Sequence, residues 1–236
     1  MTRRTKIVAT IGPASDDPAT LSALIDAGMD VARLGLAHNT IDEVLERYRR
    51  VRAAADAAGR PVGILIDLPG PKVRLGSFGD TPVEFAGGHR FTLVPGLDHS
   101  DSDKVGVDYE DLLSDVHEGD YLAVGDGSVV VRIESIKGDS AEASVAHGGP
   151  IQGRPGLHIP SDRLSITSPT QQDLEQLDAF VDAGVDMVAL SFVRSAHDIR
   201  RVGTEPYPRG PLLVAKIETR AAVENLEGII EASGRS

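Results

Sequence analysis

Residues 64–74 read Ile64-Leu65-Ile66-Asp67-Leu68-Pro69-Gly70-Pro71-Lys72-Val73-Arg74, a short apolar run that ends in a carboxylate and is followed at once by Pro-Gly-Pro. This pattern predicts a buried strand that carries Asp67 to its carboxyl end, followed by a turn that continues neither a helix nor a sheet. Beyond the turn, alternation in extended chain points Lys72 and Arg74 to the same side. The stretch is either a strand end with a solvated ion pair or part of a charged site.

The amino-acid composition limits the classes of function that the protein can have. The 236 residues are enough for one or two domains. A formal net charge of -12 argues against a broad nucleic-acid or anionic-membrane surface, so an anionic ligand would have to be bound by a local cluster. The absence of Cys excludes disulfides and thiolate metal sites. The basic amino terminus is followed by an apolar run too short for a signal peptide or a membrane span, and we expect a soluble cytoplasmic protein.

The first third of the chain has the rhythm of strand and helix in alternation. We expect strands over residues 6–12, 31–38 and 62–68, separated by helices over 19–27 and from Thr40 to Ala58. Residues 15–17 offer a helix N-cap, Asn39-Thr40 offer a second, and Gly28 and Gly59 follow the helix ends. Short turns between such elements predict βαβ units and a parallel sheet.

The pattern changes after Arg74 to short alternating runs with hairpin signals, of which Gly125-Asp126-Gly127 is the strongest. Residues 75–163 are therefore expected to form an all-β insertion. The α/β rhythm returns after Ser168, with helices over 171–183, 196–202 and 221–233 and strands over 187–193 and 212–219. The pattern thus predicts five strands of the parallel sheet and no sixth.

Four segments at the expected strand ends resemble pyruvate kinase, and the resemblance extends over nearly the whole chain. The segments are Arg4-Thr5-Lys6-Ile7-Val8-Ala9-Thr10-Ile11-Gly12-Pro13-Ala14-Ser15, Gly28-Met29-Asp30-Val31-Ala32-Arg33-Leu34, Asp67-Leu68-Pro69-Gly70-Pro71-Lys72-Val73-Arg74, and Ser191-Phe192-Val193-Arg194 with Ala215-Lys216-Ile217-Glu218-Thr219. The resemblance implies an α/β fold, a (β/α)8 TIM-type barrel that is incomplete here and interrupted after its third strand by a small all-β lid domain. Residues 1–74 and 164–236 would form the partial barrel, and residues 75–163 the lid.

The resemblance also implies an activity, glycolytic phosphoryl transfer from phosphoenolpyruvate to ADP, which gives pyruvate and ATP. Arg33 matches the arginine that contacts the transferred phosphoryl group, and Lys216 the lysine beside that group and the enolate oxygen. Glu218 matches a ligand of Mg²⁺ or Mn²⁺, and carboxylate oxygens suit these cations. From the residues alone, Arg33 could be a surface arginine, and Lys216 with Glu218 a solvated ion pair.

Further positions match the nucleotide site of the same family. Arg74 and His38 correspond to positions near the nucleotide phosphates and base, and Asp126 to a lid carboxylate. Arg154 stands where the family carries a pair of lysines that contact ATP. His38 could equally be a structural residue at a strand end.

The second strand departs from the potassium-binding pattern of many members of the family. Gly35 and Ala37 replace the Asn and Ser that supply oxygen ligands, which leaves Asp67 in a degenerate K⁺ site. Lys72 stands where K⁺-dependent members carry Glu, so its ammonium could replace the missing cation. We therefore expect that K⁺ is not required.

The segments that supply the second metal carboxylate in the family lie beyond the expected fifth strand and its helix. We therefore expect the 236 residues to be inactive alone and to self-associate, or to form a homo-oligomer. Two alternatives stay open. One is a non-catalytic or partner-completed half-barrel that binds a nucleotide or phosphorylated acid, and the other is a different reaction on an enolpyruvate-type substrate.

Overall fold

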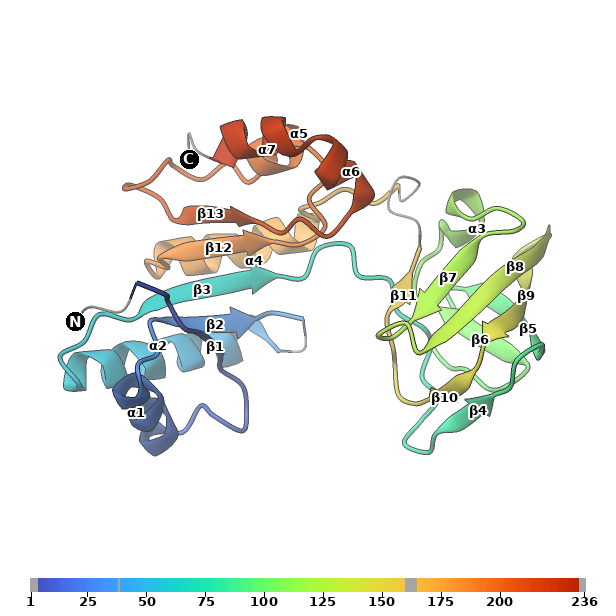
Figure 1. Ribbon diagram of the computed structural model, residues 1–236, viewed down its shortest axis with the longest axis horizontal. Coiled ribbons are helices and arrows are strands. Elements are labelled where there is room, and N and C mark those ends of the chain that lie inside the picture. Colours follow the sequence, from blue (N-terminus) through green and yellow to red (C-terminus); the bar gives the residue numbers. More distant parts are fainter. Residues whose placement is uncertain (1–3, 38, 160–164, 234–236) are drawn as a thin grey trace. The chain divides into compact units, whose positions relative to one another are not determined.

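The computed structural model describes residues 4–37, 39–159 and 165–233, and the chain divides into two compact units (Figure 1). The first unit combines Met1–Pro71 with Thr167–Ser236, and the second is Lys72–Ile166. Among the described residues, no helix has the length and apolar character needed to cross a membrane.

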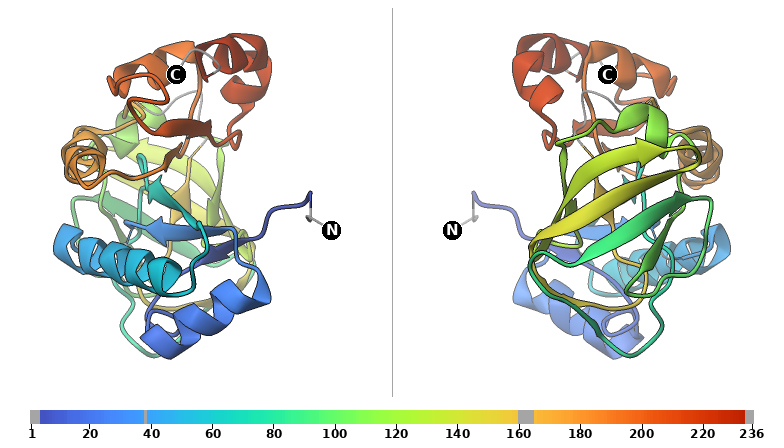
Figure 2. Two further views of the ribbon diagram at one scale, coloured as in Figure 1. Left: turned by 90° about the vertical axis from the view of Figure 1, so that its left-hand side faces the viewer. Right: turned by 90° about the vertical axis from the view of Figure 1, so that its right-hand side faces the viewer.

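The first unit contains a five-stranded parallel sheet in the order β1-β2-β3-β12-β13. Its strands are β1 (Val8–Thr10), β2 (Val31–Gly35), β3 (Gly63–Leu68), β12 (Met187–Leu190) and β13 (Leu212–Ala215). Its helices are α1 (Pro18–Ala27), α2 (Ile41–Ala57), α4 (Gln171–Asp182), α5 (Ala196–Arg201), α6 (Arg220–Glu224) and α7 (Leu226–Ser233), and they lie outside the curved sheet (Figure 2). This arrangement confirms the expected fold class, an incomplete barrel of parallel strands and covering helices.

The first two helices begin and end within one residue of the predicted positions. The Asp17 side chain accepts hydrogen bonds from the backbone N–H groups of Ala19 and Thr20 at the start of α1. Gly28 ends that helix with a φ of 106°, a left-handed conformation that glycine adopts without a steric penalty. At α2, Thr40 and Glu43 form a reciprocal capping box.

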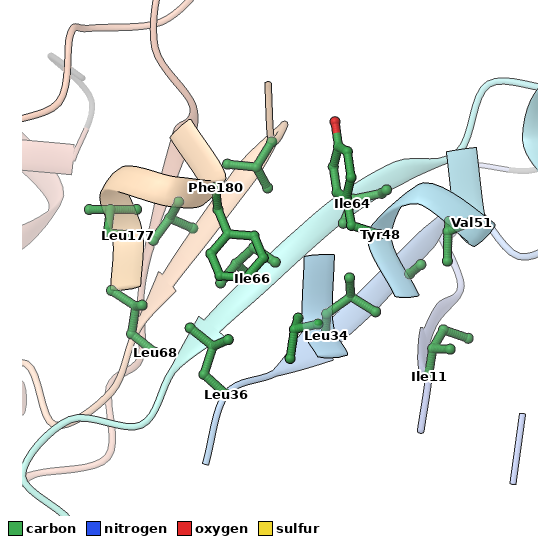
Figure 3. Packing of buried hydrophobic residues seen from close by; sticks show 14 of the residues in the cluster. Ile11, Leu34, Leu36, Tyr48, Val51, Ile64, Ile66, Leu68, Leu177 and Phe180 are labelled. Carbon is green, nitrogen blue, oxygen red and sulfur yellow. The ribbon is translucent and has the colours of Figure 1, made fainter. Parts of the chain in front are cut away.

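The hydrophobic core of this unit lies between the sheet and its helices. Ile64, Ile66 and Leu68 alternate along β3 and are at most 1% exposed. They belong to one cluster with Tyr48 of α2 and Phe180 of α4 (Figure 3). Because successive strand residues point to opposite faces, this packing leaves the side chains of Leu65 and Asp67 on the other face of the sheet.

One expected helix is divided in two. Residues 221–233 form α6 and α7 instead of one helix, and the break lies at Asn225. The Asn225 side-chain amide donates to the carbonyl oxygens of Ala221 and Arg194, so a contact with a distant segment stabilises the break. The strands β1, β2, β12 and β13 also end a few residues earlier than expected.

The second unit contains a six-stranded sheet in the order β11-β7-β8-β9-β5-β6 and a two-stranded sheet of β10 and β4. The elements are β4 (Val83–Phe85), β5 (Arg90–Pro95), β6 (Lys104–Val107), α3 (Leu112–Asp115), β7 (Tyr121–Val124), β8 (Val129–Lys137), β9 (Ser140–His147), β10 (Gly149–Ile151) and β11 (Leu157–His158). Val124 pairs with Val129, which confirms the hairpin at Gly125-Asp126-Gly127. This segment was expected to contain only β-strands, but it also contains the short helix α3.

Candidate active site

Parallel pairing brings several charged residues to one edge of the first unit's sheet. Arg33 lies on β2 and Asp67 near the end of β3, while Lys216 and Glu218 directly follow β13. The register aligns Gly35 with Asp67, Leu68 with Leu190, and Leu190 with Ala215. Since all these strands run in one direction, their carboxyl ends meet, and in barrels of this type that edge carries the active site.

Asp67 lies at the centre of this group and is only 6% exposed. Its Oδ2 accepts hydrogen bonds from Arg33 Nε at 2.8 Å and Arg33 Nη2 at 2.5 Å. The Lys216 Nζ lies 3.4 Å from the other carboxylate oxygen. The sequence predicted that Asp67 lacks K⁺ and that the Lys72 ammonium could replace it. In the structure two cations of its own unit, Arg33 and Lys216, are in contact with Asp67.

A second ion pair in the site connects Lys216 with Glu218. Lys216 Nζ donates a hydrogen bond to Ser191 Oγ at 2.7 Å and lies 3.6 Å from Glu218 Oε2. Glu218 Oε1 accepts a hydrogen bond from the backbone N–H of Phe192 at 2.9 Å. The formal charges of Arg33, Lys216, Asp67 and Glu218 sum to zero.

This zero sum bears on the ligands that the group can accept. A phosphate dianion entering alone would leave an uncompensated negative charge in a partly desolvated place. A divalent cation entering with it would restore neutrality. A phosphorylated anion and a divalent cation that entered together would thus leave the charge of the group unchanged.

Glu218 is the residue of this charged group that fits a divalent cation. Among residues 4–37, 39–159 and 165–233, no group of three or more His, Asp or Glu side chains is placed to bind a metal together. Mg²⁺ is commonly held by one or two carboxylates with water and substrate oxygens, so Glu218 can serve as one ligand of such a set. Asp67 is less suited, because it is already paired with Arg33 and Lys216.

In the second unit, three of the predicted site residues gather around the backbone of Gly156. Arg74 Nη1 donates to the carbonyl oxygen of Arg154 at 3.2 Å, and Arg74 forms a bridge with Gly156. The Lys72 Cε would lie 3.6 Å from a Cβ atom placed on Gly156. Arg154 Nη2 lies 3.7 Å from Asp108 Oδ2, so one of these cations already has an anionic neighbour.

Asp126 lies in a hairpin turn that contacts the same segment. The Gly125 N–H donates to the Gly156 carbonyl at 2.8 Å. Asp126 itself is in an exposed position, and the hydrogen bond from the Ser128 backbone N–H holds the pKa of its carboxyl below the usual range. Lys72, Arg74, Asp126 and Arg154 are thus brought to one part of the second unit, and His38 lies outside the described residues.

Three residues that contact the charged group were not predicted to have a role in it. Ser191 and Phe192 follow β12, and Thr10 at the end of β1 accepts a hydrogen bond from Arg33 Nη1 at 2.8 Å. The location of Ser191 could have been predicted from the sequence, because Ser191 belongs to an expected strand whose carboxyl end lies at the same edge of the sheet.

Comparison with known proteins agrees with the fold and the residues at this edge. A sequence model of the family described as "Pyruvate kinase, barrel domain" matches residues 2–235. The chain is 39% identical over 234 residues to a pyruvate kinase of Mycobacterium tuberculosis, with 98% of this chain and 50% of the relative covered. It is 37% identical to a pyruvate kinase of Corynebacterium glutamicum and 35% identical to one of Thermococcus litoralis, with 98% of this chain and 49% of each relative covered.

The chain thus spans about half the length of the curated relatives that it matches. The match nevertheless extends through both compact units and includes every described residue of the charged edge. Together, the matched span and the incomplete barrel of parallel strands place the chain in the pyruvate kinase family.

Proposed function

We propose that this chain supplies the amino-terminal part of a pyruvate kinase active site, which transfers a phosphoryl group between phosphoenolpyruvate and ADP in the cytoplasm. The observation that carries the proposal is the cluster of Arg33, Asp67, Lys216 and Glu218 at the carboxyl edge of the sheet. Phosphoryl transfer depends on positioning and charge stabilisation, and this cluster supplies two fixed cations beside two carboxylates.

Each side chain has a distinct part in the proposed reaction. The Arg33 guanidinium is oriented by Asp67 and Thr10, and it would contact oxygens of the transferring phosphoryl group. The Lys216 ammonium would stabilise the negative charge that develops on the enolate oxygen. Glu218 would supply one oxygen ligand to Mg²⁺ or Mn²⁺, and the bound cation would neutralise charge on the phosphate oxygens.

The second unit would contribute to the nucleotide site. Arg74 and Arg154 carry guanidinium groups suited to phosphate oxygens, and they lie close together in that unit. Asp126 would contribute a carboxylate from the exposed hairpin turn, and His38 would contact the nucleotide. As expected from the sequence, we also propose that the protein forms a homo-oligomer and that its activity does not require K⁺.

A chimera tests the proposal directly. Residues 1–233 of this chain would replace the corresponding part of the Mycobacterium tuberculosis relative, and turnover of phosphoenolpyruvate with ADP and MgCl₂ would be measured. We expect turnover of about 1–100 per second, the range of ordinary kinases. Lys216→Met should lower kcat by about 100- to 1,000-fold, the usual cost of removing one group that stabilises developing charge.

Lys104→Met is the matched control, because Lys104 is an exposed lysine on β6 of the other unit. This variant should leave kcat unchanged. A soluble, folded chimera without turnover would argue against the proposal. If that chimera still bound phosphoenolpyruvate, the result would favour the alternative, a non-catalytic half-barrel that binds phosphorylated acids.

A further inference from the structure

The turn that follows β12 contacts both charged residues that follow β13. Ser191 is 3% exposed, and its Oγ accepts the hydrogen bond from Lys216 Nζ at 2.7 Å. The same Oγ lies 3.4 Å from Asp67 Oδ1 and donates toward it. The hydroxyl therefore lies between the ammonium and the carboxylate, with its lone pairs toward one and its proton toward the other.

This hydroxyl restricts a side chain that is otherwise flexible. The Lys216 side chain is a flexible four-carbon stem and is one third exposed. Asp67 Oδ1, at 3.4 Å, is a distant partner, whereas Ser191 Oγ is within normal hydrogen-bond distance. Ser191 is thus the contact that defines where the ammonium lies.

Ser191 is itself fixed by a buried neighbour. The hydroxyl of Ser168, which is 1% exposed, donates to the Ser191 carbonyl oxygen at 2.5 Å. A Cβ atom at Gly70 would lie 3.1 Å from this carbonyl oxygen and 3.0 Å from Phe192 Cδ2, closer than ordinary contacts. Because Gly70 also has a φ of 66°, glycine suits this position next to the turn.

Phe192 has a backbone conformation that bulky residues rarely adopt. Its φ is 56°, and it is the one non-glycine residue with positive φ in the described part of the chain. Such strain persists where the surroundings impose it, and it is frequent at functional sites. Here the left-handed conformation accompanies a hydrogen bond from the Phe192 N–H to Glu218 Oε1, at 2.9 Å.

We propose that Ser191 and Phe192 act as positioning residues, with the Ser191 hydroxyl fixing the Lys216 ammonium and the Phe192 N–H fixing the Glu218 carboxylate. Lys216 and Glu218 are two residues apart in extended chain and so point to the same side, where one turn reaches both. The functional consequence rests on the proposed phosphoryl transfer. The contacts themselves are tested separately.

The first test needs neither ligand nor activity. The chain contains five lysines, Lys6, Lys72, Lys104, Lys137 and Lys216, so ¹H–¹⁵N spectra of side-chain ammonium groups are readily assigned. A hydrogen-bonded ammonium exchanges its protons slowly, and we expect a Lys216 signal in the 236-residue chain. Ser191→Ala should speed this exchange at least tenfold, and Ser191→Thr, which keeps the hydroxyl, should restore it.

Ser144→Ala is the matched control, since it also removes a serine hydroxyl that donates to a carboxylate, here Glu134 Oε1 at 2.6 Å in the other unit, but none that contacts Lys216. It should change the Lys216 exchange rate by less than threefold. Equal effects of Ser191→Ala and Ser144→Ala would overturn the positioning role and leave only a structural one. A Lys216 signal unchanged by Ser191→Ala would overturn it as well.

The second test uses the chimera described above. Ser191→Ala should lower kcat by about 10- to 100-fold, as expected for a displaced catalytic group, with KM for phosphoenolpyruvate changed less than threefold. Phe192→Gly retains the N–H and accommodates positive φ, so its affinity for Mn²⁺, measured by electron paramagnetic resonance, should match that of the unmodified chimera. Phe192→Pro removes the N–H and should weaken Mn²⁺ binding at least tenfold.

The outcomes separate the two proposals. A chimera that turns over normally with Ser191→Ala overturns the positioning role of Ser191, and equal Mn²⁺ affinities of the Gly and Pro variants overturn that of Phe192. The chimera could have no turnover while the exchange rate of the Lys216 ammonium protons still depends on Ser191. In that case the proposed function would be wrong, but the positioning of Lys216 by Ser191 would be confirmed.

Discussion

Asp67 accepts two hydrogen bonds from Arg33 and lies close to the Lys216 ammonium, although it is almost fully buried. A buried carboxylate is tolerated only when it is paired and hydrogen-bonded, because leaving it unpaired costs several kcal/mol. Asp67 therefore needs these two cations, and it orients the Arg33 guanidinium in turn. This dependence links the stability of the strand end to the arrangement of the proposed phosphoryl site.

Potassium independence is the first prediction at the residue scale. Gly35 and Ala37 carry no side-chain oxygen that could bind K⁺, Asp67 is paired with protein cations, and we propose that Lys72 adds a further fixed charge. Turnover of the chimera in tetramethylammonium buffer should therefore rise less than twofold on addition of KCl. A large activation by KCl would contradict this.

Lys72→Glu should remove most of the turnover of the chimera, and KCl should restore little of it, since the ligand oxygens for K⁺ are still missing. Lys137→Glu makes the same charge change at an exposed position at the end of β8 and should have little effect. Equal loss in both variants would show that net charge, and not the place of Lys72, is responsible.

At this scale the sequence located side chains but not their contacts. Strand order and the resemblance placed Arg33, Asp67, Lys216 and Glu218 at one edge. They did not predict that Arg33 turns onto Asp67, because strand position defines the face of a residue and not its rotamer. The left-handed conformation of Phe192 has no sequence signal, since positive φ is ordinarily signalled by glycine.

The elements of the second unit are connected by a buried polar contact. Asp115 of α3, which is 3% exposed, accepts hydrogen bonds from the Tyr109 hydroxyl, from Ser165 N–H at 2.9 Å and from Ser165 Oγ at 2.7 Å. Burial opposes ionisation of Asp115, but these hydrogen bonds outweigh it and hold its pKa below the ordinary value. The contact ties the end of the unit to its short helix.

The second unit should fold on its own when residues 72–166 are expressed, because its sheets and hydrophobic cluster are formed within that range. Dispersed amide signals in ¹H–¹⁵N spectra would confirm this. In this fragment Asp115→Asn should lower the free energy of unfolding in urea by about 1–3 kcal/mol at pH 7, the usual cost of disrupting a buried hydrogen-bonded group.

The same contact gives a pH dependence with a defined sign. The pKa of Asp115 is lower in the folded than in the unfolded state. The ionised carboxyl therefore stabilises the fold fully at pH values above the unfolded-state pKa of about 3.9, and this stabilisation is lost as the pH falls through the folded-state pKa. The difference in the free energy of unfolding between wild type and Asp115→Asn should therefore shrink as the pH falls below about 4. A difference that stays constant over this range would show that Asp115 stabilises the unit by packing alone.

At the scale of the elements, local sequence signals predicted where each long helix starts. They did not predict a helix boundary that depends on a contact with a distant segment. The capping box of Thr40 and Glu43 can be found in the sequence because its partners are three residues apart. The division of α6 from α7 involves no Gly or Pro, and the Asn225 amide is held by Arg194, 31 residues away. Periodicity alone extended the helix through that point.

At the scale of the whole molecule, the sheet of the first unit has two outer edges. Within the described residues, β1 pairs only with β2, and β13 only with β12. Apolar side chains are exposed beside these edges, with Val8 54%, Leu212 43% and Val214 39% exposed. Unpaired strand edges with exposed apolar residues are sites of association.

The metal ligands in the described part of the chain lead us to expect low activity of the isolated chain. Glu218 offers one carboxylate to a divalent cation, and the described residues provide no cluster of three ligands for it. A cation held by one carboxylate is weakly positioned, and a displacement of about 1 Å can cost ~100-fold in rate. We expect the 236 residues alone to show at most about one thousandth of the turnover of the chimera in the same assay.

The 236-residue chain purified alone should also self-associate through the edges of its sheet. Light scattering at about 100 µM should give a mass above that of the monomer, and the combined change Val8→Lys with Val214→Lys should reduce it, because a charged side chain at a strand edge opposes pairing. Tyr121→Lys combined with Thr81→Lys is the matched control, since it adds the same two charges at exposed positions of the other unit, where Tyr121 is 59% exposed. If the control reduced the mass as much as the edge variant, association would follow from net charge. If the unmodified chain were a monomer at this concentration, the edges of β1 and β13 would not be sites of association, and the exposed apolar residues beside them would be tolerated in water as they are.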